Sequence, residues 1–185
     1  MNPRERLKEL IQEKCVLHGD FVLASGQRSK VFFDCKRATL DPEGVHLIAT
    51  LILETLDRIA VDDGRPIDAI GGPTIGADPI VGHVAGLSWE QAVKSTGSGS
   101  ETGAPRPLRA FLVRKAMKDH GTQRVIENDI PRGARVAMVE DVVTTGGSTL
   151  QAIRQVEEAG LEVAVVLAVI DREQGGAKTL TGYRY

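Results

Sequence analysis

The sequence has few cysteines, no long hydrophobic run and almost no excess of charge of either sign. Its two cysteines, Cys15 and Cys35, form neither a CxxC pair nor a metal-ligand array. Because no signal-peptide pattern precedes them, we expect reduced thiols and a cytoplasmic protein. No apolar stretch is long enough to cross a bilayer. The formal net charge of −2 argues against extensive binding to nucleic acids or membranes, so any affinity for anions must be local.

Two common nucleotide-binding patterns are also missing. The chain has no Gly-Lys-Ser/Thr at the spacing of a P-loop and no Gly-x-Gly-x-x-Gly, which argues against nucleoside-triphosphate and dinucleotide sites of those kinds. What it does have is 185 residues, 42% of them hydrophobic and 26% charged, which is typical of a globular chain with a substantial core.

The spacing of apolar residues predicts helices and strands in the N-terminal part. A helical spacing covers 4–17, and two short apolar runs around a Ser-Gly turn predict a small hairpin of strands 21–24 and 31–34 beside the main domain. A further helix is expected over 42–59, because proline fits the first helical position.

From residue 68 onward, apolar strands alternate with helical stretches, which is the pattern of a parallel α/β sheet. The expected strands are 68–71, 109–113, 135–139 and 162–170, and the expected helices are 77–87 and 148–159. Ligands bind such sheets at the carboxyl ends of the strands. Four segments should converge there: Gly72-Pro73-Thr74, Arg114-Lys115, Glu140-Asp141 and Asp171-Arg172.

The low-complexity run STGSGSETGAPRP at 95–107 cannot build a core. We interpret it as a flexible surface insertion. A domain boundary is the alternative, but neither side holds a complete sheet. We therefore expect one domain over 1–185, with the N-terminal helix and hairpin at 1–40 and the core at 41–185. After Gly175-Gly176, any final helix or strand is expected to be missing or very short.

The segment 136–150 is the most informative part of the chain, because a buried strand leads into two acids and then a loop rich in glycine and hydroxyl groups. Gly146 and Gly147 let the backbone approach a ligand, and a helix starting near Ser148 offers unpaired N–H groups to a phosphate. The loop hydroxyls that can donate to phosphate oxygens belong to Thr144, Thr145, Ser148 and Thr149. Glu140 and Asp141 would repel a phosphate, so they fit ribose hydroxyls, a metal or developing positive charge on a sugar. An ordinary strand-to-helix turn capped by Ser148 is the alternative.

The segment 113–124 supplies local positive charge. Its four Arg and Lys residues and one Asp give a charge of +3 with His120 neutral. Arg114 can grip phosphate through its planar fork, Lys115 and Lys118 can act as mobile charges, and a glycine near the end permits a hinge. The alternative is a solvated basic loop.

The run from Glu140 to Ser148 resembles the signature by which type I phosphoribosyltransferases bind 5-phosphoribosyl-1-pyrophosphate (PRPP). Arg114-Lys115-x-x-Lys118-Asp119-His120-Gly121 is similar to the mobile catalytic loop of orotate phosphoribosyltransferases, and Phe32-Phe33-Asp34 and Asp171-Arg172 occur in the same order as in that family. The resemblance covers nearly the whole chain from Gly19 to Gly176. It implies an α/β type I phosphoribosyltransferase fold, with a central parallel sheet flanked by helices and a small N-terminal hood hairpin.

The same resemblance implies transfer of the phosphoribosyl group from PRPP to orotate in pyrimidine (UMP) biosynthesis. The implied catalytic residues are Lys118, Asp141 and Glu140. The implied PRPP-binding residues are Arg114, Lys115, Lys118, His120, Glu140, Asp141, Thr144, Thr145, Gly146, Gly147 and Ser148, and the implied orotate-binding residues are Phe32, Phe33, Thr144 and Arg172. The implied cofactor is Mg²⁺ held mainly by PRPP rather than by protein ligands, and the implied assembly is a homodimer that shares the catalytic loop across its interface, with no nucleic acid or membrane partner. The alternatives are a phosphoribosyltransferase for another nucleobase and a non-catalytic regulator that senses PRPP.

Three positions depart from the family pattern. Ala24 and Gly76 stand where some members carry lysines, and Asn128 stands where a glycine is common. Lys30 or Lys36 could supply the missing charge. Two assigned features also have ordinary structural alternatives: at least one of Phe32 and Phe33 could be a core residue, and Asp171-Arg172 could be a surface ion pair.

Overall fold

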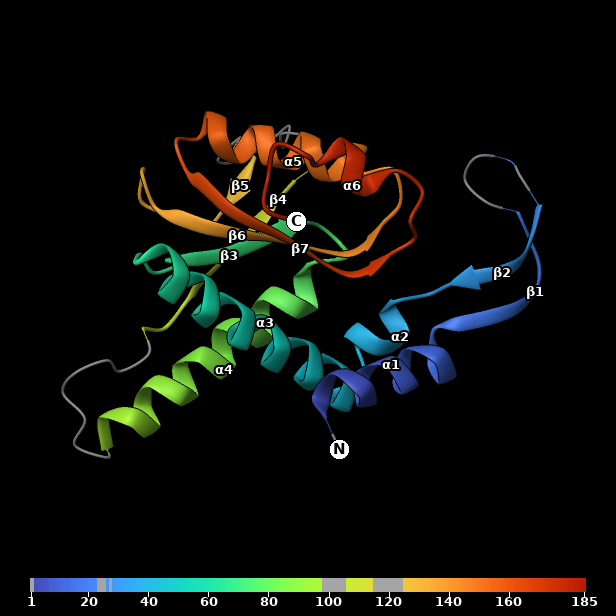
Figure 1. The fold of residues 1–185 in the computed structure, drawn as a ribbon, viewed down its shortest axis with the longest axis horizontal. Coiled ribbons are helices and arrows are strands. Elements are labelled where there is room, and N and C mark those ends of the chain that lie inside the picture. Colours follow the sequence, from blue (N-terminus) through green and yellow to red (C-terminus); the bar gives the residue numbers. More distant parts are fainter. Residues whose placement is uncertain (1, 23–25, 27, 98–105, 115–124) are drawn as a thin grey trace.

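The computed structural model describes residues 2–22, 26, 28–97, 106–114 and 125–185. A central twisted sheet lies between two layers of helices, with α3 (Pro42–Asp63) and α4 (Asp78–Gly97) on one face and α5 (Gly147–Glu158) on the other, as Figure 1 shows. The N-terminal helix and hairpin extend to one side of this body. The predicted α/β class is confirmed.

The sheet has the strand order β5-β4-β3-β6-β7 within the described part of the chain. Its strands are β3 (Ala69–Pro73), β4 (Arg109–Val113), β5 (Ile126–Glu127), β6 (Arg135–Val143) and β7 (Glu162–Asp171). All neighbours pair in parallel except β5, which runs antiparallel to β4. Every residue of β3 is buried, because helices cover both faces of the sheet and its central strands need apolar residues throughout.

Two hydrophobic cores hold the helices to the sheet. On one face, residues such as Ile52 and Ile80 of α3 and α4 pack against Ile70 and Val139. On the other face, Ile153 of α5 packs with buried residues of β4 and β6. The prediction for α3 is confirmed: the Asp41 side chain accepts a hydrogen bond from the Gly44 N–H, and Pro42 opens the helix.

The N-terminal boundaries differ from the prediction. Helix α1 (Pro3–Lys14) ends before residue 17, and β1 (Val16–Val22) begins five residues earlier than expected. Its partner β2 (Arg28–Phe33) is also shifted toward the N-terminus. The reason is tertiary, because cross-strand pairing, as in Leu17 opposite Phe32, overrides the local helical spacing.

The strand β6 is also longer than predicted. It was expected to end at Val139, but it continues through both acids to Val143, because Val143 still pairs with Asp171 of β7. Two short elements were not predicted, β5 and α2 (Lys36–Thr39), and the final element left open by the sequence is the short helix α6 (Gly176–Thr179). The expected insertion begins later than 95, since α4 continues through Gly97, and 98–105 lie outside the described residues.

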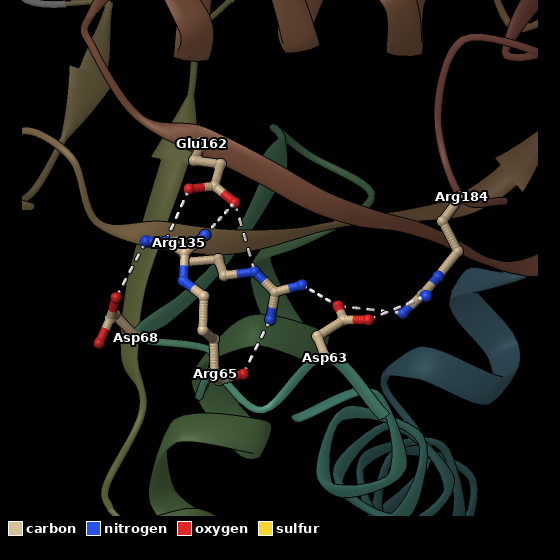
Figure 2. Close-up of polar contacts among 6 residues, drawn as sticks. All are labelled: Asp63, Arg65, Asp68, Arg135, Glu162 and Arg184. Atoms are coloured by element: carbon tan, nitrogen blue, oxygen red, sulfur yellow. Dashed lines mark hydrogen bonds and ion pairs between the residues drawn. The ribbon is translucent and has the colours of Figure 1, made fainter. Parts of the chain in front are cut away.

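A cluster of charged residues joins the amino ends of the strands (Figure 2). It consists of Asp63, Arg65, Asp68, Arg135, Glu162 and Arg184. Arg135 is almost fully buried and pairs with Asp63, while Arg65 holds Glu162 through two hydrogen bonds of 3.0 and 2.8 Å. Because the strands are parallel, this cluster lies at the edge of the sheet opposite their carboxyl ends. None of the helices in the described ranges is long and apolar enough to cross a membrane.

Candidate active site

The carboxyl ends of β3, β4, β6 and β7 bring the predicted segments to one edge of the sheet. The Thr74 N–H donates to the Val113 carbonyl (3.1 Å), which joins the loop after β3 to the end of β4. The Arg172 N–H donates to the Val143 carbonyl (2.9 Å), which joins the ends of β7 and β6. The predicted convergence is therefore confirmed for the described segments, and it gives a ligand several neighbouring loops to contact.

Asp141 is the acid that faces this edge. Its Oδ1 accepts a hydrogen bond from the Val142 N–H at 2.8 Å, which fixes the carboxylate close to its own strand. The Cys35 thiol donates to the Asp141 carbonyl oxygen at 3.7 Å, so the segment after the hairpin is joined directly to the acid strand. Burial, with a further contribution from the Asp141 charge, raises the pKa of the Cys35 thiol to about 12 and keeps it a neutral donor. Sequence reasoning gave Cys35 no role.

Gly76 lies directly against this carboxylate. A Cβ atom built at Gly76 would stand 2.3 Å from Asp141 Oδ1, so no side chain fits there while Asp141 keeps its position. In this arrangement glycine fits at position 76, where some family members have lysine. Lys30, one of the residues suggested to supply the missing charge, forms an ion pair with Asp20 within the hairpin.

Glu140 points to the opposite face of the strand, because successive side chains of β6 alternate. It is 8% exposed, and its Oε2 accepts a hydrogen bond from Thr149 Oγ1 at 3.1 Å. The prediction that the Thr149 hydroxyl donates to a phosphate is therefore corrected: it is buried and donates to Glu140. The pairing links β6 to the first turn of α5. The sequence analysis assigned both acids to the same ribose site, whereas the extended strand directs their side chains to opposite faces of the sheet.

The loop after β6 has the backbone geometry that a phosphate requires. Gly146 has a φ of +77°, a conformation that favours glycine, and it caps α5 without a side-chain hydrogen bond. The alternative in which Ser148 caps the helix is wrong, since α5 already begins at Gly147. The first intrahelical bond joins the Leu150 N–H to the Gly146 carbonyl (2.9 Å), so the preceding amides have no acceptor within the helix. Gly147, Thr145 and Ser148 are exposed, and their groups can face an anion.

The short helix α6 fixes this loop. Thr179 Oγ1 donates to the Thr145 carbonyl oxygen at 2.6 Å, and atoms of Gly176 and Thr179 lie 3.2 Å from where a Gly146 Cβ would stand. The Gly175-Gly176 pair was the sequence signal for this close packing, but it was interpreted only as the point after which any final element is missing or very short.

Arg172 and Phe33 lie together beside the acid strand. The Arg172 guanidinium carbon is 5.6 Å from the centre of the Phe33 ring, within range of a cation–π contact. Phe32 lies on the other face of the hairpin and packs against Phe21, with ring centres 5.4 Å apart. The alternative of an Asp171-Arg172 ion pair is not what the structure shows, since Asp171 accepts hydrogen bonds from the Tyr185 hydroxyl and the Glu173 N–H, both at 2.8 Å.

Arg114 directly follows β4, and its guanidinium pairs with Glu127 of β5 at 2.9 Å. The remaining residues predicted in the basic segment, Lys115, Lys118 and His120, lie outside the described residues. Asn128 has a φ of +85°, which accounts for the glycine common at this position, because asparagine also tolerates left-handed backbone. Its side chain donates to the Ala110 carbonyl (2.7 Å) and holds β5 against β4.

The donor groups at this edge were also compared with the needs of Mg²⁺. In the described ranges, no three His, Cys, Asp or Glu side chains come together as a metal site. Asp141 is partly exposed, whereas Glu140 is buried on the other face of β6, so the two carboxylates do not converge on one ion. This donor set fits a Mg²⁺ ion held mainly by ligand oxygens, because Mg²⁺ in phosphate sites takes few protein ligands.

Comparison with known proteins identifies the family. No protein-family model matches the chain. Orotate phosphoribosyltransferase from Bradyrhizobium diazoefficiens is 41% identical over 181 residues, covering 95% of this chain and 86% of the relative. The crystal structure of Mycobacterium tuberculosis H37Rv orotate phosphoribosyltransferase with Fe(III) dicitrate is similar with a TM-score of 0.73 at 35% identity, covering 98% of this chain and 94% of that one. The structure of the same enzyme in complex with PRPP has a TM-score of 0.69 at 32% sequence identity, covering 98% of this chain and 93% of that one. The predicted type I phosphoribosyltransferase fold is confirmed, and the chain belongs to the orotate phosphoribosyltransferase family.

Proposed function

We propose that this protein transfers the 5-phosphoribosyl group of PRPP to orotate, giving orotidine 5′-monophosphate and pyrophosphate in pyrimidine (UMP) biosynthesis. The observation that carries the proposal is the arrangement around the end of β6. There Asp141, the Thr144–Ser148 loop and the Arg172-Phe33 pair occupy neighbouring positions on one sheet edge. Family membership supports the same reaction.

The β6–α5 loop would bind the 5′-phosphate of PRPP. The free amides at the start of α5 and the hydroxyls of Thr144, Thr145 and Ser148 supply donors, and the helix dipole favours an anion there. The Asp141 carboxylate would accept hydrogen bonds from the ribose hydroxyls and oppose positive charge on the sugar. Glu140, on the other face of β6, would act indirectly by accepting a hydrogen bond from Thr149 at the start of α5.

Catalysis would be mainly electrostatic. The C1′–O bond to pyrophosphate breaks as orotate N1 bonds to C1′, and the N1 proton passes to pyrophosphate or water. Negative charge grows on the leaving group while the ribose approaches an oxocarbenium ion. Arg114, Lys115, Lys118 and His120 would bind the pyrophosphate, and Lys118 would stabilise the transition state. Mg²⁺ bound to PRPP would neutralise part of the same charge. Closure of the basic loop would exclude water, which otherwise hydrolyses the donor.

The acceptor base would lie near Arg172 and Phe33. An arginine can hold the carboxylate of orotate through paired hydrogen bonds, and the aromatic ring can pack against the pyrimidine. Thr144 would add a donor, and Phe32, on the other face of the hairpin, would act indirectly by packing against Phe21. We further propose a cytoplasmic homodimer that shares the Lys118 loop between subunits. The two buried cysteines are free thiols, which agrees with a reducing compartment.

A comparison of turnover with different bases tests this proposal. The protein is mixed with PRPP and Mg²⁺, and the absorbance of orotate, adenine, hypoxanthine or uracil is followed in parallel reactions. We expect turnover of orotate well above that of the other bases. Faster turnover of another base would support the alternative phosphoribosyltransferase. PRPP binding without turnover of any base would support the donor-sensing regulator.

A further inference from the structure

Helix α6 lies beside the start of α5 and contacts the β6–α5 loop (Figure 1). A Cβ atom built at Gly176 would stand 2.4 Å from Val143 Cγ1, so glycine allows this close approach. The approach brings the Thr179 hydroxyl to the loop, where Oγ1 lies 2.6 Å from the Thr145 carbonyl oxygen. The Gly175 carbonyl oxygen is farther, at 3.2 Å. Because a hydroxyl has one hydrogen, the shorter contact to Thr145 is the main hydrogen bond.

This hydrogen bond sets the orientation of the peptide group between Thr145 and Gly146. The group is trans and planar, so its carbonyl and its N–H point in opposite directions. With the carbonyl held toward Thr179, the Gly146 N–H points away from α6. Because α6 fills one side of the loop, a phosphate must approach from the other side, to which this N–H points.

The Gly146 N–H has no acceptor of its own. Gly146 is buried, and none of the described residues accepts a hydrogen bond from its amide. A buried amide without an acceptor is rare, because it has given up its hydrogen bonds to water. This amide is therefore a donor that a bound anion would satisfy.

Without the Thr179 hydrogen bond, the loop would have a second arrangement. Gly146 has a φ of +77°, and glycine adopts positive and negative φ almost equally, so this residue offers little resistance to rotation of the peptide group by about 180°. The rotated group would turn the Thr145 carbonyl oxygen toward the phosphate, and the two oxygen atoms would repel each other. One hydrogen bond favours the productive arrangement by about tenfold.

We propose that Thr179 is a positioning residue for PRPP, because its hydroxyl holds the Thr145–Gly146 peptide group in the orientation that presents the Gly146 N–H to the 5′-phosphate. This inference rests on the proposed function, in which the β6–α5 loop binds that phosphate. Thr179 itself contacts no substrate, and it acts far from the bond that breaks at C1′. Its loss should therefore weaken the binding of PRPP with little effect on kcat.

Thr179→Val tests the role of the hydroxyl, because it keeps the shape of the side chain. The probe is ribose 5-phosphate, which has the ribose and 5′-phosphate of PRPP but no leaving group, so its binding does not depend on turnover. We expect calorimetry to show a dissociation constant about tenfold higher than for the wild type. With orotate as the acceptor, KM for PRPP should rise by a similar factor, while kcat and KM for orotate stay within about twofold. Thr179→Ser keeps the hydroxyl and should recover most of the affinity.

Thr181→Val is the matched control. Thr181 Oγ1 donates to the Lys178 carbonyl oxygen at 3.0 Å, a similar hydrogen bond that does not involve the loop. This variant should bind ribose 5-phosphate as the wild type does. If circular dichroism shows that Thr179→Val is unfolded, Thr179→Ala removes the same hydroxyl and takes its place.

The outcomes separate this role from the reaction. Unchanged ribose 5-phosphate binding in the folded variant without the hydroxyl, or an equal loss in Thr179→Ser or Thr181→Val, would overturn the proposal. A wild-type protein that does not bind ribose 5-phosphate would overturn it as well. Weaker binding only in the variant without the hydroxyl, together with no turnover of orotate, would reject the proposed reaction and leave the role of Thr179 intact.

Discussion

At the residue scale, the contact between Gly76 and Asp141 constrains the site most tightly. Alanine at position 76 would place its Cβ 2.3 Å from Asp141 Oδ1, so the carboxylate must move away from the ribose position. We expect Gly76→Ala to lower kcat/KM for PRPP by about 10²-fold, the usual cost of a displacement of about 1 Å. Steady-state kinetics with varied PRPP measure this. Gly182→Ala, where the added Cβ meets nothing, should keep full activity; an equal loss in both variants would remove the steric explanation.

Arg172 has a separable role at the base. Its guanidinium lies over Phe33 and not against Asp171, so it is oriented toward the hairpin. We predict that Arg172→Ala raises KM for orotate by about tenfold or more, through loss of a charged hydrogen bond, while KM for PRPP changes little. Initial rates with each substrate varied in turn give both constants. An increase confined to KM for PRPP would indicate that Arg172 contacts PRPP and not orotate.

At the scale of elements, the charged cluster at the start of β6 holds α3, β6 and the start of β7 together (Figure 2). Hydrogen bonds from Arg135 and Arg65 lower the pKa values of Asp63 and Glu162 respectively. A carboxyl with a lowered pKa in the folded state stabilises the fold above its unfolded pKa, about 4, and loses this contribution as the pH falls further. The cluster should therefore stabilise the protein at neutral pH and lose this stabilising contribution in acid.

Arg135→Met tests this assignment, because it keeps the volume and removes the charge. We expect Tm to fall by about 5 °C at pH 7, and the difference from wild type to shrink below about pH 3, where the carboxyls are protonated. Thermal unfolding followed by circular dichroism measures both. Arg109→Met, at the exposed start of β4, is the control: Arg109 lies outside the cluster and donates to the Asp129 carbonyl oxygen, and its loss should leave Tm nearly unchanged. A Tm difference independent of pH would mean that packing, not charge, explains the loss.

The apolar strands and long helices could be predicted from sequence because burial on both faces leaves a continuous hydrophobic signal. The short elements could not: β5 has two residues, and α6 has four. The end of β6 was misplaced because two acids resemble a strand terminus, whereas pairing with β7 extends the strand to Val143. The same extension sends Glu140 toward Thr149 and Asp141 toward Gly76, and neither contact leaves a trace in residue spacing. The loop itself was recognised because its glycines and hydroxyls are contiguous.

At the scale of the whole molecule, the residues that stabilise the sheet and the residues of the candidate active site lie at opposite ends of the strands. The charged cluster lies at the amino ends of the strands, and the candidate active site lies at their carboxyl ends. The hairpin contacts this site through Phe33, and the segment after it through Cys35. The proposed dimer would complete this arrangement, since the family resemblance implies that Lys118 acts in the site of the other subunit.

Subunit complementation tests the shared loop. Lys118→Ala should lower kcat by roughly 10²-fold or more, and Asp141→Asn should weaken donor use without unfolding the chain. If Lys118 acts across the interface, heterodimers of the two variants contain one site with both residues intact. We expect these heterodimers to recover about half of the wild-type rate per dimer. Inactive heterodimers of verified composition would show that the loop serves its own subunit.

The most direct test of the proposed reaction is product identification with a matched variant. The wild-type protein is incubated with PRPP, Mg²⁺ and orotate, and the products are separated and identified by mass. We predict orotidine 5′-monophosphate and pyrophosphate in equal amounts, formed about 10²-fold more slowly by folded Asp141→Asn. Hydrolysis of PRPP without orotidine 5′-monophosphate, or an Asp141→Asn variant as fast as wild type, would contradict the account.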